Sequence, residues 1–152
     1  MSGGANAKNE KERVTLHARI RTLVVDDSPF MLKLLAQILK QMANFDLVGT
    51  ATNGGQALRQ VSALSLDLVL MDFHLPGLNG IQATQYIKRR ERPPAVVIIS
   101  SDARPITKEM AQKAGADGFL NKEEDLQHRL MSVLENLFGP AVADSSFHKQ
   151  AA

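Results

Sequence analysis

The chain contains no cysteine among its 152 residues. Disulfide bonds, thiol catalysis and thiolate metal ligands are therefore excluded. It also has no apolar run close to the roughly 20 residues that a membrane helix requires, and residues 1–19 lack the apolar core of a signal peptide. Its content of 44% hydrophobic and 22% charged residues is typical of a soluble globular protein of one domain. We therefore expect a cytoplasmic protein that has no contact with a membrane.

The chain has little net charge, +2 at pH 7, although its isoelectric point is near 9.0. Residues 1–21 hold five lysines and arginines against two glutamates, or +3, so that the remaining residues carry −1. A basic tail on a nearly neutral body does not predict direct nucleic-acid binding. We interpret residues 1–18 as a flexible N-terminal extension, 19–138 as the folded domain and 139–152 as a C-terminal tail.

Between residues 19 and 138, short apolar runs alternate with segments of helical periodicity. The apolar runs predict strands at 22–25, 45–51, 67–71, 95–99 and 118–121. The helical segments predict helices at 29–42, 55–64, 81–87, 105–114 and 125–138. Runs without polar alternation are typical of strands buried on both faces. Five strands alternating with five helices predict an α/β domain with a doubly wound parallel sheet.

Two of the predicted helices carry a clear apolar stripe. Ser28 can cap the first of them, with Pro29 at its first helical position. We expect this helix to bury the apolar residues that recur at every fourth position, which are Phe30, Leu34, Ile38 and Met42. The last helix is expected to bury Leu126, Leu130, Val133 and Leu137.

Three carboxylates follow two of the predicted strands. Asp26 and Asp27 come directly after the first strand, and Asp72 follows the third. Parallel strands bring their carboxyl ends to one edge of the sheet, so these side chains should converge. Like charges held close together oppose their own ionisation unless a cation or a proton relieves them. An acidic pocket of this kind suits Mg2+, which binds one or two carboxylates together with water and phosphate oxygens.

Two further polar residues end later strands at the same predicted edge. Ser100 follows the fourth strand and Lys122 follows the fifth. A hydroxyl donor and a compact cation are groups that can hold phosphoryl oxygens. Taken singly, each site residue has an ordinary explanation, since an acid after a strand can cap a helix and a lysine is commonly a solvated surface cation. Their joint occurrence at strand ends favours a phosphoryl-binding site.

In this arrangement the chain resembles the receiver domain of bacterial two-component response regulators over residues 19–138. The resemblance lies in the acidic pair 26–27, the segment 70–80 around Asp72, Ser100 at the end of the fourth strand, and the segment 115–122. It implies a flavodoxin-like sheet with the strand order 2-1-3-4-5.

The resemblance also implies roles for the acids. Asp72 would be the nucleophile that accepts a phosphoryl group from a phosphohistidine on a sensor histidine kinase or a histidine phosphotransfer protein. Asp26, Asp27, Asp72 and the backbone carbonyl of His74 would hold Mg2+, the implied cofactor. Such a domain catalyses only its own phosphorylation and dephosphorylation, so we do not expect an enzyme that acts on other substrates. For the His74 side chain, an exposed loop position is favoured over a role as metal ligand.

For the later strands, the resemblance implies contacts with the transferred group and a conformational switch. Lys122 and Ser100 would contact the phosphoryl group, and Phe119 would turn inward as Ser100 moves, which would change a protein-interaction surface. His74 and Asp102 would flank the path of the water that removes the phosphoryl group.

The chain departs from the family pattern at a few positions. Glu123 follows Lys122 where proline is usual, which leaves the geometry of this loop open. Ser100 stands in place of a commoner threonine and keeps the hydroxyl, and Ser101 stands where a small alanine is typical.

Two other functional classes fit the sequence less well. A phosphohydrolase of haloacid-dehalogenase type would carry an Asp-x-Asp motif after the first strand, where this chain has Asp26-Asp27-Ser28. A flavodoxin-like FMN carrier would need a polar phosphate loop in place of these acids, and a Gly-rich dinucleotide fingerprint is missing. The output is left open by the sequence: a downstream protein target or an output domain of a longer chain. The oligomeric state, with a homodimer as one possibility, is left open as well.

Overall fold

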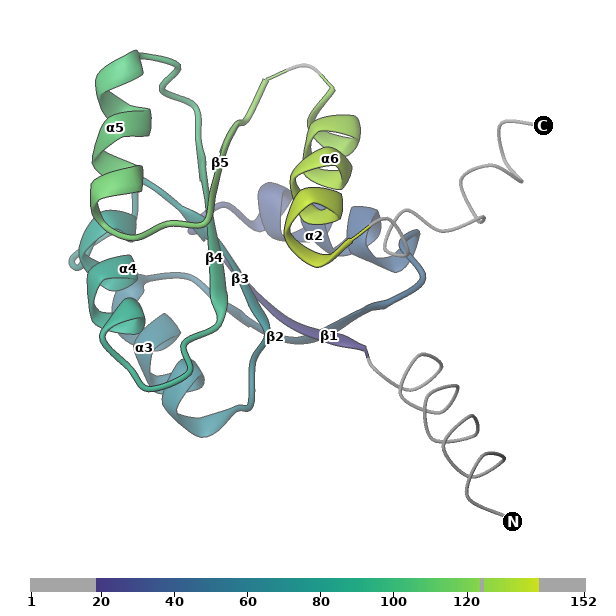
Figure 1. The fold of residues 1–152 in the computed structure, drawn as a ribbon, viewed down its shortest axis with the longest axis horizontal. Coiled ribbons are helices and arrows are strands. Elements are labelled where there is room, and N and C mark those ends of the chain that lie inside the picture. Colours follow the sequence, from purple (N-terminus) through teal and green to yellow (C-terminus); the bar gives the residue numbers. More distant parts are fainter. Residues whose placement is uncertain (1–18, 124, 140–152) are drawn as a thin grey trace, which may run out of the picture.

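The computed structural model describes residues 19–123 and 125–139 and shows a five-stranded parallel sheet flanked by helices (Figure 1). The strands are β1 (Ile20–Val25), β2 (Phe45–Ala51), β3 (Leu68–Asp72), β4 (Ala95–Ser100) and β5 (Gly118–Asn121). The helices are α2 (Pro29–Lys40), α3 (Gly54–Ala63), α4 (Gly80–Lys88), α5 (Pro105–Lys113) and α6 (Leu126–Phe138). The order across the sheet is β2-β1-β3-β4-β5, and all neighbouring pairs are parallel. The predicted fold class and strand order are confirmed.

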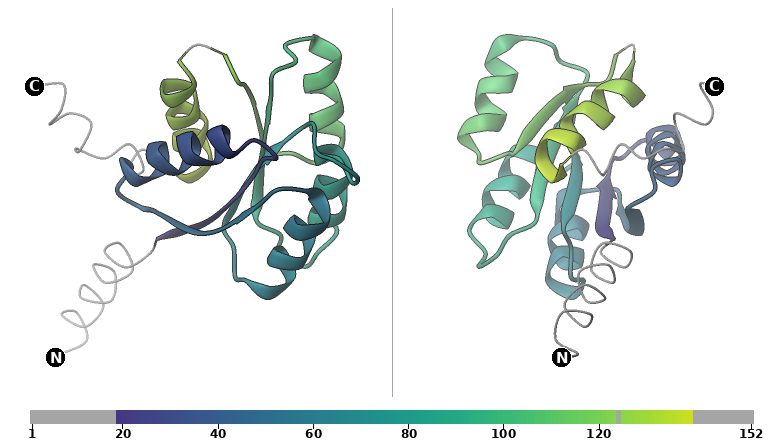
Figure 2. Two further views of the ribbon diagram at one scale, coloured as in Figure 1. Left: turned by 180° about the vertical axis from the view of Figure 1, so that it is seen from behind. Right: turned by 45° about the vertical axis from the view of Figure 1, so that its right-hand side comes forward.

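The helices form a layer on each face of the sheet (Figures 1 and 2). α2 and α6 cover one face, and α3, α4 and α5 cover the other. β3 lies in the centre of the sheet, and all five of its residues are buried. Leu68 and Leu70 belong to the hydrophobic cluster under α2 and α6, whereas Val69 and Met71 belong to the cluster under the other three helices. Burial on both faces explains why this strand is an apolar run without alternation.

The starts of α2 and α3 follow local capping signals. The Ser28 hydroxyl accepts a hydrogen bond from the Met31 N–H at 3.3 Å, and Pro29 is the first residue of α2. The Asn53 side chain accepts one from the Gln56 N–H at 2.8 Å at the start of α3. Each bond satisfies a backbone donor that the first helical turn leaves without a partner, so the helix begins directly after the strand-end residues.

The predicted buried stripe of α2 is wrong at its N-terminal end. Phe30 is 72% exposed, whereas Ile38 and Met42 are buried as predicted and Leu34 is partly buried. A spacing of four residues drifts by about 40° per step on a helix of 3.6 residues per turn, so a stripe of three steps cannot stay on the core. The buried residues of α2 are Leu35, Ile38 and Leu39.

The predicted stripe of the last helix is wrong after Leu130. Leu126 and Leu130 are buried as predicted, but the third fully buried residue of α6 is Leu134. Val133 and Leu137 lie on either side of it and are only partly buried. The buried face of α6 therefore keeps a spacing of four over its whole length instead of shifting to three after Leu130.

Within the described ranges, no helix has the length and apolar character needed to cross a membrane. The predicted N-terminal extension, residues 1–18, and residues 140–152 of the predicted tail lie outside the part that the structure describes.

Candidate functional site

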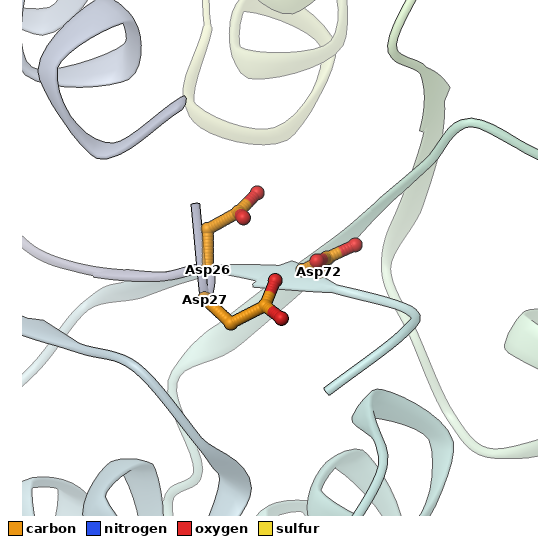
Figure 3. A group of neighbouring side chains, drawn as sticks. All are labelled: Asp26, Asp27 and Asp72. Carbon is orange, nitrogen blue, oxygen red and sulfur yellow. The ribbon is translucent and has the colours of Figure 1, made fainter. Parts of the chain in front are cut away.

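The three carboxylates meet at the carboxyl edge of the sheet (Figure 3). Val25 pairs with Met71 in the β1–β3 ladder, so the residues that follow them, Asp26 and Asp72, lie on neighbouring strands. One carboxylate oxygen from each of Asp26, Asp27 and Asp72 lies within 4.8 Å of the others. Asp26 and Asp72 are only 1% and 4% exposed, whereas Asp27 is exposed. Two buried acids and one solvent-facing acid thus form one cluster.

Backbone hydrogen bonds fix the positions of the two buried acids. The Asp26 N–H donates to the Ala51 carbonyl at 3.0 Å, and Asp26 Oδ1 accepts from the Ser28 N–H at 2.9 Å. Asp72 Oδ1 accepts from the His74 N–H at 3.3 Å. Each acid therefore bonds to the backbone two residues farther along, an arrangement that turns the chain where the strand ends.

Lys122 supplies the positive charge of the site. Its Nζ lies 2.8 Å from Asp26 Oδ2 and 3.1 Å from Asp72 Oδ1. Its backbone N–H donates to the Ser100 carbonyl at 2.8 Å, which holds the residue at the end of β5. One ammonium thus bridges the two buried carboxylates, and Asp27 has no ion pair within the described ranges.

The pKa values of Asp72 and Lys122 are both raised, but for different reasons. Burial raises the pKa of the Asp72 carboxyl, and the negative charge of Asp26 adds to the rise, although Lys122 and the His74 N–H oppose it. Burial alone would lower the pKa of Lys122, but its hydrogen bonds and charge interactions with Asp26 and Asp72 outweigh burial and raise it. Lys122 therefore stays protonated at neutral pH, and Asp72 is less acidic than an aspartate in water.

The donor set fits Mg2+. Three carboxylates supply hard oxygen ligands, and the single ammonium leaves the cluster with a net negative charge. The His74 side chain is exposed and does not join the acids, and its ring lies 4.7 Å from the ring of Phe73. The structure thus places this side chain where the sequence favoured it, while a bond from its backbone carbonyl to Mg2+ stays a prediction.

The predicted switch residues lie on adjacent strands. Ser100 is fully buried at the end of β4, and its hydroxyl oxygen accepts a hydrogen bond from the Asp102 N–H at 3.0 Å. Phe119 pairs with Ile98 in the β4–β5 ladder and is partly buried. It lines two open pockets at the surface: one of about 480 Å³ between the start of α5, β5 and α6, and one of about 220 Å³ between α5 and β5. The switching role of Phe119 stays a prediction.

Sequence reasoning missed Arg104. This residue holds both carboxylate oxygens of Asp102, with its Nε 3.0 Å from Oδ1 and its Nη2 2.7 Å from Oδ2. The sequence signal for this ion pair was an aspartate and an arginine two positions apart, in the loop that follows a strand. The loop after Lys122, which the sequence left open, has Glu123 exposed, and all peptide bonds of the described residues are trans.

Comparison with known proteins places this chain in a family. The family model of the response regulator receiver domain matches residues 22–135. Protein-glutamate methylesterase/protein-glutamine glutaminase 2 of Pseudomonas fluorescens is 37% identical over 121 residues, which cover 78% of this chain and 32% of that protein. The chain spans about a quarter to a third of the length of the curated relatives that it matches.

Solved structures agree with the sequence relatives. The response regulator domain of Thermotoga maritima CheB is 32% identical, with a TM-score of 0.66, and the match covers 78% of this chain and 91% of that one. The CheX–CheY–BeF3–Mg2+ complex of Borrelia burgdorferi contains a chain that is 26% identical, with a TM-score of 0.73, and the match covers 78% of this chain and 89% of that one. All five strands with the acids, Ser100 and Lys122 at their ends lie largely within the matched residues. The chain therefore belongs to the response regulator receiver domains of two-component systems.

Proposed function

We propose that Asp72 is the phosphoacceptor of this receiver domain and takes its phosphoryl group from a phosphohistidine of a sensor histidine kinase or a histidine phosphotransfer protein. The observation that carries the proposal is the position of Asp72, buried at the centre of the sheet edge, within reach of two other acids and 3.1 Å from the Lys122 ammonium. A nucleophile, a cation-binding acid pair and a fixed positive charge are the groups that phosphoryl transfer requires.

In the transfer step, a carboxylate oxygen of Asp72 attacks the phosphorus atom in line with the bond to the histidine nitrogen. The P–O bond to Asp72 forms as the P–N bond breaks, and the electron pair of that bond returns to the imidazole. Lys122 favours the ionised, nucleophilic form of Asp72 despite its burial. Its ammonium then lies close enough to bind a phosphoryl oxygen, since it already contacts the accepting carboxylate.

Mg2+ would be held by the carboxylates of Asp26, Asp27 and Asp72 with the His74 carbonyl, and when bound it would neutralise charge on the phosphoryl oxygens. Asp27 suits this role because it is exposed and makes no ion pair among the described residues. The Mg2+ and BeF3 in the Borrelia burgdorferi complex support this part of the proposal. The same site would return to its resting state when water removes the phosphoryl group.

The phosphorylated state would act through protein contacts. The Ser100 hydroxyl would bond to a phosphoryl oxygen, and Phe119 would follow it inward, which would alter the surface of α5, β5 and α6. The curated relatives are methylesterases much longer than this chain, so an output domain of that kind and a separate protein target are both compatible with it. Within this domain, chemistry is limited to its own phosphorylation and dephosphorylation.

The experiment is phosphoryl transfer from a phosphorylated histidine phosphotransfer protein, or from a small acyl phosphate, in Mg2+ or in EDTA. We expect label on Asp72 in Mg2+ and almost none in EDTA. Asp72→Asn should remove the label, and Asp27→Asn should raise the Mg2+ concentration needed for it. Glu91→Gln, which changes an exposed carboxylate outside the site, is the matched control. Label that survives Asp72→Asn would show that another residue is the acceptor.

A further inference from the structure

The segment that joins β4 to α5 is held by its own short hydrogen bonds. The Asp102 N–H donates to Ser100 Oγ at 3.0 Å, and Asp102 Oδ1 accepts from the Arg104 N–H at 3.0 Å. The Arg104 side chain adds bonds from Nε at 3.0 and 3.1 Å and from Nη2 at 2.7 Å. All these bonds join residues within 100–104, so they fix the shape of the segment between the end of β4 and the start of α5.

The carboxylate of Asp102 also holds the residue that precedes α5. Arg104 is the N-cap residue of this helix, but its side chain makes no capping bond. The pKa of Asp102 lies far below its usual range because Arg104 donates to it from side chain and backbone, and the buried Thr107 side chain also favours the ionised form. Asp102 therefore ties the Ser100 hydroxyl at one end of the segment to the start of α5 at the other.

An arginine is required for this two-point contact between Arg104 and the carboxylate of Asp102. Its planar guanidinium can bind both oxygens of one carboxylate, which a lysine ammonium cannot do with the same geometry. The Arg104 side chain is 74% exposed and the Asp102 side chain 17%. An ion pair with one such exposed partner adds little to global stability, so its effect should be on local geometry.

We propose that Arg104 is a positioning residue that, by holding Asp102, makes residues 100–107 one rigid segment through which the Ser100 hydroxyl is joined to α5. The inference rests on the proposed function, in which Ser100 moves toward the phosphoryl group on Asp72. A rigid segment passes that movement to α5, whereas a loose segment absorbs it. Arg104 touches neither the acids nor Lys122 through any hydrogen bond or ion pair within the described ranges.

The first arm of the test uses the unphosphorylated protein and measures amide hydrogen exchange. Arg104→Ala should speed exchange of the residue 102 amide by about threefold or more, the factor expected when a hydrogen bond of ordinary strength no longer restrains its surroundings. The exchange rate of the same amide in Arg104→Lys should lie between the rates in Arg104→Ala and in the parent. Lys108→Ala removes an exposed cation from the next turn of α5, makes no bond to Asp102 and should leave exchange unchanged. Equal exchange in the parent and Arg104→Ala would overturn the inference.

The second arm separates transmission from chemistry. When Asp72 is labelled, Arg104→Ala should reach a phosphorylation level within about twofold of the parent, because the site keeps its own hydrogen bonds. The change that labelling causes in the amide exchange of α5 should, however, be less than about half of the change seen in the parent. Asp102→Ala should reduce the response of α5 by the same amount. The double variant, Asp102→Ala with Arg104→Ala, should reduce it no further than either single variant. A labelled Arg104→Ala protein whose α5 responds like the parent contradicts the inference alone. A parent that takes no label contradicts the proposed function, and the inference with it.

Discussion

Lys122 is the residue on which the balance of the site depends. Its ammonium lies between Asp26 and Asp72, at 2.8 and 3.1 Å, and both acids are buried. Burial still raises the pKa of Asp72, so one ammonium does not fully compensate for the desolvation of this carboxylate. Ionised Asp72, the form that the proposed phosphoacceptor requires, therefore costs the fold some stability.

The raised pKa of Asp72 predicts a pH-dependent stability. A carboxyl whose pKa is higher in the folded than in the unfolded protein binds its proton more readily when folded, so its favourable contribution is present below the unfolded pKa and is lost as pH rises through the folded pKa. Asp72→Asn should therefore raise the free energy of unfolding at pH 7 in EDTA. The gain should shrink as the pH falls toward 4.5, as measured by urea unfolding.

Glu91→Gln serves as the control for Asp72→Asn, since its carboxylate is exposed and makes no ion pair within the described ranges. It should leave the free energy of unfolding close to that of the parent at both pH values. If Asp72→Asn were less stable than the parent at pH 7, the ion pair with Lys122 would outweigh burial, and the direction inferred for the pKa would be wrong.

At the scale of elements, α2 carries apolar residues on both its buried and its exposed face, and mutations can measure the difference in stability. Leu35 is 1% exposed and Phe30 is 72% exposed. Leu35→Ala should lower the free energy of unfolding by about 2–5 kcal/mol because it leaves a cavity in the core. Phe30→Ala should change it by less than about 0.5 kcal/mol. Urea unfolding of both variants tests this, and a large loss for Phe30→Ala would mean that its ring is covered in solution.

The start of α4 packs directly onto the backbone of the site. A Cβ at Gly80 would collide with the Asp72 carbonyl oxygen, and the Gly80 N–H donates to the Phe73 carbonyl at 3.0 Å. Gly80→Ala should therefore push the backbone at Asp72 out of place, lower the free energy of unfolding by about 1–3 kcal/mol and slow labelling of Asp72.

Gly77 provides the matched comparison, because it has φ +72° but open space around its Cβ position. Gly77→Ala should cost about 1–2 kcal/mol through backbone strain alone and leave the rate of labelling unchanged. Equal labelling rates for the parent and Gly80→Ala would show that α4 can shift without moving the acceptor.

The strands and the strand-end residues could be predicted from the sequence because their signals are local. An apolar run without alternation predicts a strand buried on both faces, and a parallel sheet brings the ends of such strands together, as Asp26, Asp72 and Lys122 show. Phe30 could not be placed, since the choice between neighbouring helix faces depends on what packs against them. The clamp of Arg104 on Asp102 depends on the loop conformation, which no periodicity in the sequence records.

At the scale of the whole molecule, the acid cluster predicts a dependence of stability on divalent cations. A ligand that binds only the folded state adds RT ln(1 + [L]/Kd), about 2.7 kcal/mol when its concentration is 100 times Kd. The melting temperature should therefore rise with millimolar Mg2+, as measured by scanning calorimetry. Asp27→Ala should reduce the rise, because it removes the exposed acid that lacks a counter-charge in the described structure. A melting temperature that does not depend on Mg2+ would contradict the metal site.

The order of the site residues along the chain has a consequence for synthesis on the ribosome. Asp26, Asp27 and Asp72 end β1 and β3, which pair with each other, whereas Lys122 follows β5 at the edge of the sheet. Domains can begin to fold as the chain emerges, at about 5–20 residues per second. The three acids therefore leave the ribosome several seconds before Lys122, because 50 residues separate Asp72 from Lys122. Until Lys122 has been made, the buried pair of Asp26 and Asp72 has no ammonium beside it, so we expect the carboxyl edge of the sheet to be completed only after β5.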